Sequence, residues 1–77
     1  MDYPIVEIIW RDAECDPEWK KIDKISKGNL PIVYTIGYLL HEDKEKYIVA
    51  STIGDDEATA TMMIPVDWVT KISLITF

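Results

Sequence analysis

The sequence predicts a mainly β protein, a small five-stranded barrel with one short helical insertion after the first strand. The chain has 77 residues, its apolar residues gather in short runs rich in β-branched and aromatic types, and turn-forming residues separate these runs. A chain of this length cannot divide its apolar residues between two cores. We therefore expect a single domain over residues 1–77.

The first strand is expected over residues 4–11, with the sequence P-I-V-E-I-I-W-R. Val6, Ile8 and Trp10 alternate with other residues in this run, so they share one face of the strand. That face should contribute to the core. Because aromatic side chains bury large areas, we expect Trp10, Trp19 and Trp68 to supply much of that core.

A helical insertion is expected next. Asp16 can cap the first backbone N–H groups of a helix, and Pro17 suits the first helical position, where no donor is needed. Trp19, Ile22 and Ile25 follow at a spacing of three, which predicts one apolar edge packed on the core. The lysines of the segment should then face the solvent, with a glycine at position 28 ending the helix.

The rest of the chain predicts β-structure. Strands are expected over residues 31–40, 46–53 and 58–64, then a single turn over 65–68 and a last strand over 69–76. Gly37 interrupts the first of these runs, which is typical of a bulge or bend in a small barrel. The polar sequence H-E-D-K-E-K should form a hairpin turn.

Two resemblances bear on the fold. The stretch M-I-P-V-D-W-V-T-K-I resembles the end of Src-homology-3 barrels, where one 3₁₀ turn precedes the last strand, and it implies an SH3-like barrel. W-R-D-A, V-Y-T-I-G-Y-L-L, Y-I-V-A-S and I-P-V-D-W-V together resemble short proteins of bacteria and their phages with a W-x-D-A opening and an I-P-x-x-W-V ending. That resemblance implies a phage or mobile-element setting and no particular activity.

Charge limits the possible partners. The net charge of −6 argues against duplex DNA and anionic membranes, because both attract basic surfaces. Four of the eight basic residues nevertheless lie in residues 18–28. Cys15 is the only cysteine, so no internal disulfide can form, and a cytoplasmic location is expected. No apolar run approaches the length of a membrane span.

The sequence gives little sign of catalysis. His41 is the only histidine and has no paired nucleophile or second metal ligand in a known motif, so we predict neither an enzyme nor a cofactor. The alternating acids from Asp12 to Glu18 match the spacing of a calcium loop, but Pro17 stands where that loop requires glycine. We therefore predict no metal site, and we expect Cys15 to be a buried or half-buried thiol.

The remaining candidates are binding residues. A cationic strip on the helical insertion could meet phosphates or an acidic protein, and one tyrosine of the 31–40 strand should be exposed as a stacking or contact surface. The candidate site residues are Arg11, Trp19, Lys20, Lys24, Lys27, Tyr34 and Tyr38. Arg11 would join the strip if the insertion folds back on the first strand.

The leading hypothesis is a non-enzymatic binding protein, a homo-oligomer and phage accessory factor. Its partner would be a host protein or a small anionic, nucleotide-like ligand held between subunits. One alternative is a nucleic-acid-binding barrel of the Sm or oligonucleotide-binding type, which would use the tyrosines for stacking and the lysines for phosphates. Another is a structural subunit of a larger particle.

Overall fold

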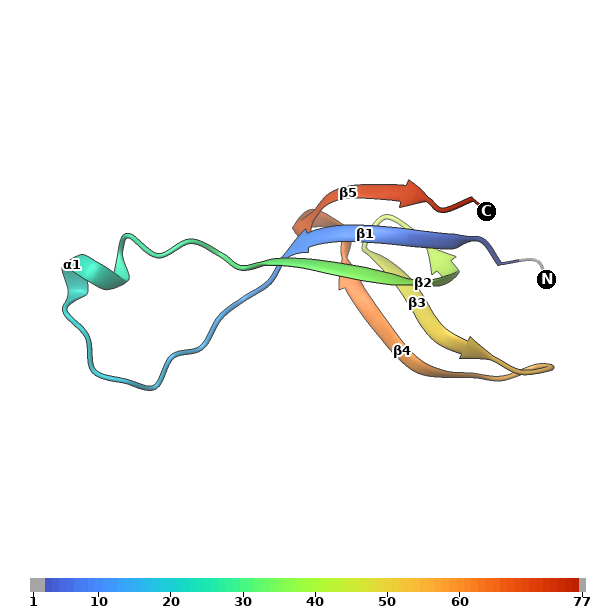
Figure 1. Ribbon diagram of the computed structural model, residues 1–77, viewed down its shortest axis with the longest axis horizontal. Coiled ribbons are helices and arrows are strands. Elements are labelled where there is room, and N and C mark those ends of the chain that lie inside the picture. Colours follow the sequence, from blue (N-terminus) through green and yellow to red (C-terminus); the bar gives the residue numbers. More distant parts are fainter. Residues whose placement is uncertain (1–2, 77) are drawn as a thin grey trace.

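A computed structural model describes residues 3–76 (Figure 1). Its strands are β1 (Ile5–Arg11), β2 (Ile32–Glu42), β3 (Lys46–Ile53), β4 (Ala58–Pro65) and β5 (Val69–Leu74). One short helix, α1 (Ile22–Ile25), lies between β1 and β2, and a 3₁₀ turn, η1 (Val66–Trp68), joins β4 to β5. The five strands form one antiparallel sheet in the order β4-β3-β2-β1-β5.

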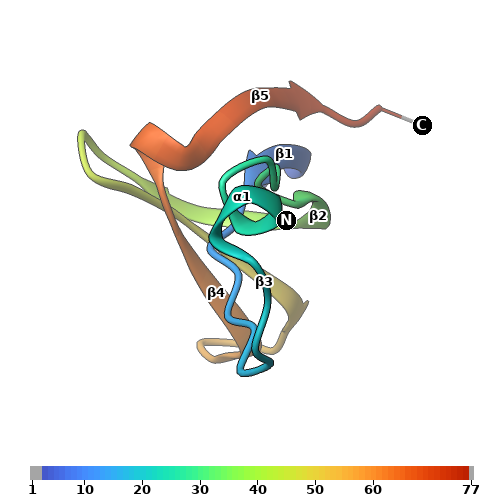
Figure 2. The same cartoon turned by 90° about the vertical axis from the view of Figure 1, so that its left-hand side faces the viewer.

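The prediction of five strands and one short helix after the first strand is confirmed. Closure into a barrel is not confirmed, because the edge strands β4 and β5 do not pair anywhere in residues 3–76. The sheet is strongly bent instead, and η1 turns the chain from one edge to the other (Figures 1 and 2). Within these residues no helix has the length and apolar character needed to cross a membrane.

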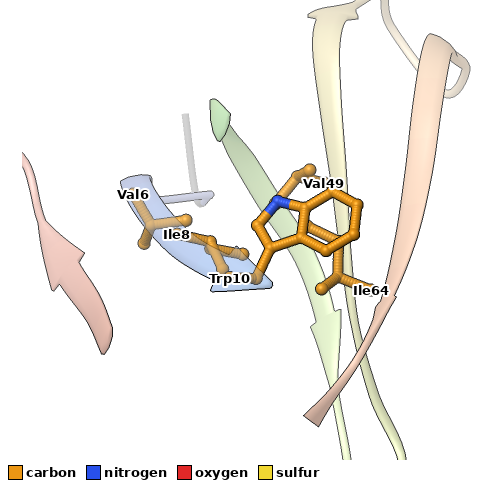
Figure 3. Packing of buried hydrophobic residues seen from close by; sticks show 5 residues of the cluster. All are labelled: Val6, Ile8, Trp10, Val49 and Ile64. Atoms are coloured by element: carbon orange, nitrogen blue, oxygen red, sulfur yellow. The ribbon is translucent and has the colours of Figure 1, made fainter. Parts of the chain in front are cut away.

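The core lies on the concave side of the sheet. Val6, Ile8 and Trp10 of β1 point toward Val49 of β3 and Ile64 of β4 (Figure 3). Ile8 and Ile64 have no exposed surface at all. The alternation predicted for the first strand is thus confirmed, since period-two burial is what a strand with one covered face requires.

Gly37 allows β2 and β3 to approach closely. It is buried opposite Val6, and a Cβ atom built on it would lie 2.9 Å from the carbonyl oxygen of Ala50 and 3.3 Å from the Val49 Cβ atom. Any side chain at this position would therefore push β3 away from β2. The register between the two strands shifts just beyond this point, between Leu39 and His41.

Residues 12–31, which we call the arm, leave the sheet after β1 and return at β2 (Figure 1). The Asp12 N–H donates to the Pro31 carbonyl oxygen at 3.1 Å and joins the two limbs at their base. The arm then extends away from the sheet, and the molecule measures 51 × 25 × 21 Å. The radius of gyration is 15.8 Å, whereas a compact domain of this length has about 11.5 Å.

The arm corrects several predictions. The helix spans four residues and begins after Lys21, and Trp19, Ile22 and Ile25 are exposed where a packed edge was expected. Trp19 therefore contributes nothing to the core, and Trp68 is only partly covered, with 43% of its surface exposed. The expected spacing is present in the sequence, but the arm extends away from the strands, so nothing else in residues 3–76 covers its apolar edge (Figure 1).

Candidate functional site

Three regions hold the candidate binding residues: the arm, a recess at its base and the outer face of β1 and β2. The first is the arm tip, residues 18–28, which carries Trp19, Ile22 and Ile25 (Figure 2). Trp19 is fully exposed at 101%, and Ile22 is 83% exposed. Soluble proteins seldom expose a cluster of large apolar side chains without a partner for it. The tip therefore has the character of a contact surface.

The tip lysines are interleaved with acids and do not form one continuous strip. Lys20 donates a hydrogen bond to Asp16, an interaction that raises the pKa of Lys20 and lowers the pKa of Asp16. Lys20 and Lys24 border a hollow of about 470 Å³ in the arm, together with Glu14, Asp16 and Glu18. Lys24 is in α1, whereas Lys27 lies in the turn that follows it.

Arg11 is separate from these lysines. It ends β1 at the base of the arm, and the arm does not fold back to bring the tip to it (Figure 1). Arg11 instead borders a recess of about 410 Å³, which we call the basal recess. The other residues lining it are Asp12, Ala13, Leu30, Asp67, Trp68, Val69 and Thr70.

Trp68, which lines the basal recess, is held in place by its contact with the core. The Trp68 ring stacks on the buried Trp10 ring with 6.3 Å between centroids and 19° between planes. The Trp10 Nε1–H in turn donates to the Thr35 hydroxyl at 2.9 Å, which fixes the orientation of the lower ring. An indole held in this way presents a flat, partly exposed surface in the recess that Arg11 also lines. Arg11 is accompanied in the lining by Asp12 and Asp67, so the recess suits a planar group that offers an acceptor to the guanidinium and donors to the two carboxylates.

The outer face of the sheet is apolar along β2. Because paired residues point to the same side, Ile32, Tyr34 and Ile36 share a face with Arg11, Ile9 and Glu7, which are their respective partners on β1. Ile32, Tyr34 and Ile36 are 59%, 66% and 61% exposed. Tyr38 follows Gly37, lies opposite Ala50 and is half-buried. Tyr34 is thus the more accessible of the two tyrosines.

The polar hairpin between β2 and β3 is organised around Asp43. Its carboxylate accepts hydrogen bonds from Lys46 Nζ at 2.9 Å and from the backbone N–H groups of Glu45 and Lys46, and it lies 2.8 Å from His41 Nε2. Hydrogen bonds from Lys46, and then from His41, hold the pKa of Asp43 well below its usual range. These bonds close a turn, so His41 has a structural partner here.

The acids near the arm also have local roles. The Asp12 carboxylate accepts from the Ala13 N–H at 2.8 Å, and the Asp16 carboxylate accepts from the Glu18 N–H at 3.0 Å. No group of three or more histidine, cysteine or acidic side chains in residues 3–76 is arranged to hold a metal ion. Cys15 is exposed, which differs from the buried or half-buried thiol that was expected.

Sequence reasoning missed the basal recess as a site. The I-P-V-D-W-V stretch predicts only a feature of the fold, although three of its residues, Asp67, Trp68 and Val69, line the recess. The signal that could have revealed it was the presence of a tryptophan at the 3₁₀ turn together with Arg11 next to Trp10. Comparison with known proteins found no matching family model, no similar curated protein and no similar solved structure.

Proposed function

We propose that this chain is a non-enzymatic binding protein that holds a small anionic, nucleotide-like ligand in the basal recess. The observation that carries the proposal is the Trp68 indole, stacked on Trp10 and lying in one recess with Arg11. A base or similar ring would stack on the indole, and a phosphate would accept hydrogen bonds from the guanidinium. Asp12, Asp67 and Thr70 supply acceptors for ligand hydroxyl or amino groups.

Within this proposal the sheet is a partly open relative of the SH3-like barrels. The 3₁₀ turn between the last two strands supports that assignment. A phage accessory factor acting in the cytoplasm would fit such a module, because a protein that works by occupancy needs affinity and no turnover. It would remove its ligand from the host by holding it.

Binding can be tested by titrating the protein with ATP and with a cyclic dinucleotide while following tryptophan fluorescence. We expect saturable quenching, and we expect Arg11→Ala to weaken binding about tenfold or more, because a charge-assisted hydrogen bond is lost. Trp68→Leu should weaken it too, while keeping an apolar cover over Trp10. Lys71→Ala, which removes an exposed cation outside the recess, is the matched control and should change affinity by less than about twofold.

Two results would count against a nucleotide ligand. Quenching that does not saturate with either probe would reject the recess as their site, as would unchanged affinity in Arg11→Ala. Preferential binding of a single-stranded oligonucleotide that weakens steeply with salt would instead favour the nucleic-acid alternative. The net charge of −6 weighs against that alternative.

A further inference from the structure

Two apolar surfaces are left uncovered within residues 3–76, and because the arm extends away from the sheet (Figure 1) they do not cover one another within one copy. One is the arm tip, and the other is the outer face of β2 with Ile32, Tyr34 and Ile36. We propose that a second copy of the chain joins them, the arm tip of each copy packing on the outer face of the other. This inference concerns a surface outside the basal recess and stands without the proposed ligand.

The arm tip is poorly stabilised by itself. The α1 helix has four residues, its N-cap Lys21 makes no side-chain capping bond, and none of its residues is buried. An isolated helix this short is far below the length that is stable in water, so helical structure in proteins depends on packing of an apolar face. Trp19 alone offers roughly 150–250 Å² for burial. A surface from outside the chain is therefore needed to hold the tip in this form.

The outer face of β2 has the matching character. Its three exposed apolar side chains are aligned along one strand, and Glu7 lies beside Ile36 in the pairing with β1. Arg11 is beside Ile32, at the end of the face nearest the arm. The lysines of a tip would therefore lie near Glu7 if the tip covered the end of the face that is farther from the arm base.

Charge favours contact between a tip and a sheet over contact between two tips. Residues 18–28 hold four lysines, one glutamate and one aspartate, a net charge of +2. Outside residues 12–31 the chain holds nine acidic and four basic residues, a net charge of −5. Two tips would repel each other, whereas a tip and the sheet of a second copy attract. If two copies exchange their arms about a two-fold axis, each tip covers the outer face of the other copy. The assembly then ends at two copies, because neither surface is left open.

The mass of the protein in solution tests the proposal. Size-exclusion chromatography with light scattering should give twice the 8.9 kDa chain mass, and a single-chain or larger mass would overturn the proposal. Trp19→Ala combined with Ile22→Ala should reduce it to the single-chain mass, and so should Tyr34→Ala combined with Ile36→Ser. Leu74→Ala is the matched control, because Leu74 is 64% exposed on β5 and lies outside both surfaces. Far-ultraviolet circular dichroism checks that each variant retains the sheet.

A mixing experiment then identifies which surfaces meet. The tip variant keeps an intact sheet face, and the face variant keeps an intact tip. Mixed at high concentration and trapped with a lysine-reactive cross-linker, the two should form a pair of about twice 8.9 kDa that neither forms alone. No pair in the mixture would overturn the contact between tip and face. A wild-type chain that stays monomeric at every concentration, or a Leu74→Ala effect as large as the tip effect, would also overturn it.

Discussion

The sheet and the arm contain the same kinds of apolar residue in opposite surroundings. Ile8 in β1 has no exposed surface, whereas Ile22 in α1 is 83% exposed. Trp10 is 7% exposed and hydrogen-bonded to Thr35, whereas Trp19 is fully exposed. The buried apolar residues of the sheet stabilise the fold. The exposed apolar residues of the arm remain free to contact another surface. The contrast shows that an apolar side chain contributes to a fold only through the neighbour that covers it.

The largest difference between the two regions should appear on truncation of an isoleucine in each. Ile8→Ala leaves a cavity in the core and should lower the free energy of unfolding by about 2–5 kcal/mol. Ile22→Ala removes an exposed side chain and should change it by about 0.5 kcal/mol or less. Chemical denaturation at low protein concentration measures both without a contribution from association. Similar losses from both variants would mean that the arm packs on its own sheet.

A second comparison is between a glycine of the sheet and a glycine of the arm. Gly37→Ala places a Cβ atom 2.9 Å from the Ala50 carbonyl oxygen and should destabilise the fold by about 1–3 kcal/mol. Gly28→Ala places a Cβ atom 3.3 Å from the Ile25 carbonyl oxygen. Because the arm extends away from the strands, its backbone can shift to relieve this contact (Figure 1). The same denaturation curves should show a clearly smaller effect at position 28. Equal effects would indicate that the approach of β2 and β3 is not tight.

The sheet also contains one strained position. Ala60 in β4 has a φ of 53°, in the left-handed region, where a side chain raises the energy of the backbone and glycine does not. Ala60→Gly should therefore raise the melting temperature, with a gain in stability of about 1 kcal/mol. Thr59→Gly in the same strand is the control and should destabilise, since that position has no such strain. A loss of stability in Ala60→Gly would contradict the left-handed backbone.

The smallest expected effect concerns pH and the hairpin at Asp43. The pKa of the Asp43 carboxyl is lower in the folded chain than in the unfolded chain, where it is about 4. The ionised carboxylate therefore stabilises the fold above about pH 4, and this stabilisation is lost as the pH falls from there toward the folded-state pKa. Asp43→Asn should therefore make the unfolding free energy less sensitive to pH in the acidic range. Melting curves at a series of pH values measure this. Asp55→Asn, in the turn between β3 and β4, controls for removal of a turn carboxylate.

The strands were predictable because each carries its own pattern and its own turn signals. The strand at 46–53 has the predicted bounds, whereas the register shift in β2 lies between Leu39 and His41, just beyond the position predicted at Gly37. The exposure of the Trp19 side chain was not predictable in the same way. A spacing of three identifies which side of a segment is apolar, but it does not identify what covers that side.

The basal recess was inaccessible to sequence reasoning for a related reason. It joins Arg11 from the end of β1, Leu30 from the returning limb of the arm and Trp68 from η1. These residues are distant in the sequence, and the pairing of β1 with both β2 and β5 brings them together. Tyr34 and Tyr38 show the same limit, because Tyr38 is paired with residues of both β1 and β3, whereas the pairing of Tyr34 is with β1.

The hydrogen bond between Asp12 and Pro31 has one further consequence. Since the arm leaves and rejoins the sheet at a single point, its length and sequence can vary while the strand pairings stay in register. The molecule is in this sense a scaffold with an exchangeable loop. Rewriting residues 13–30, by evolution or by design, would change the surface that the arm presents while keeping the same sheet.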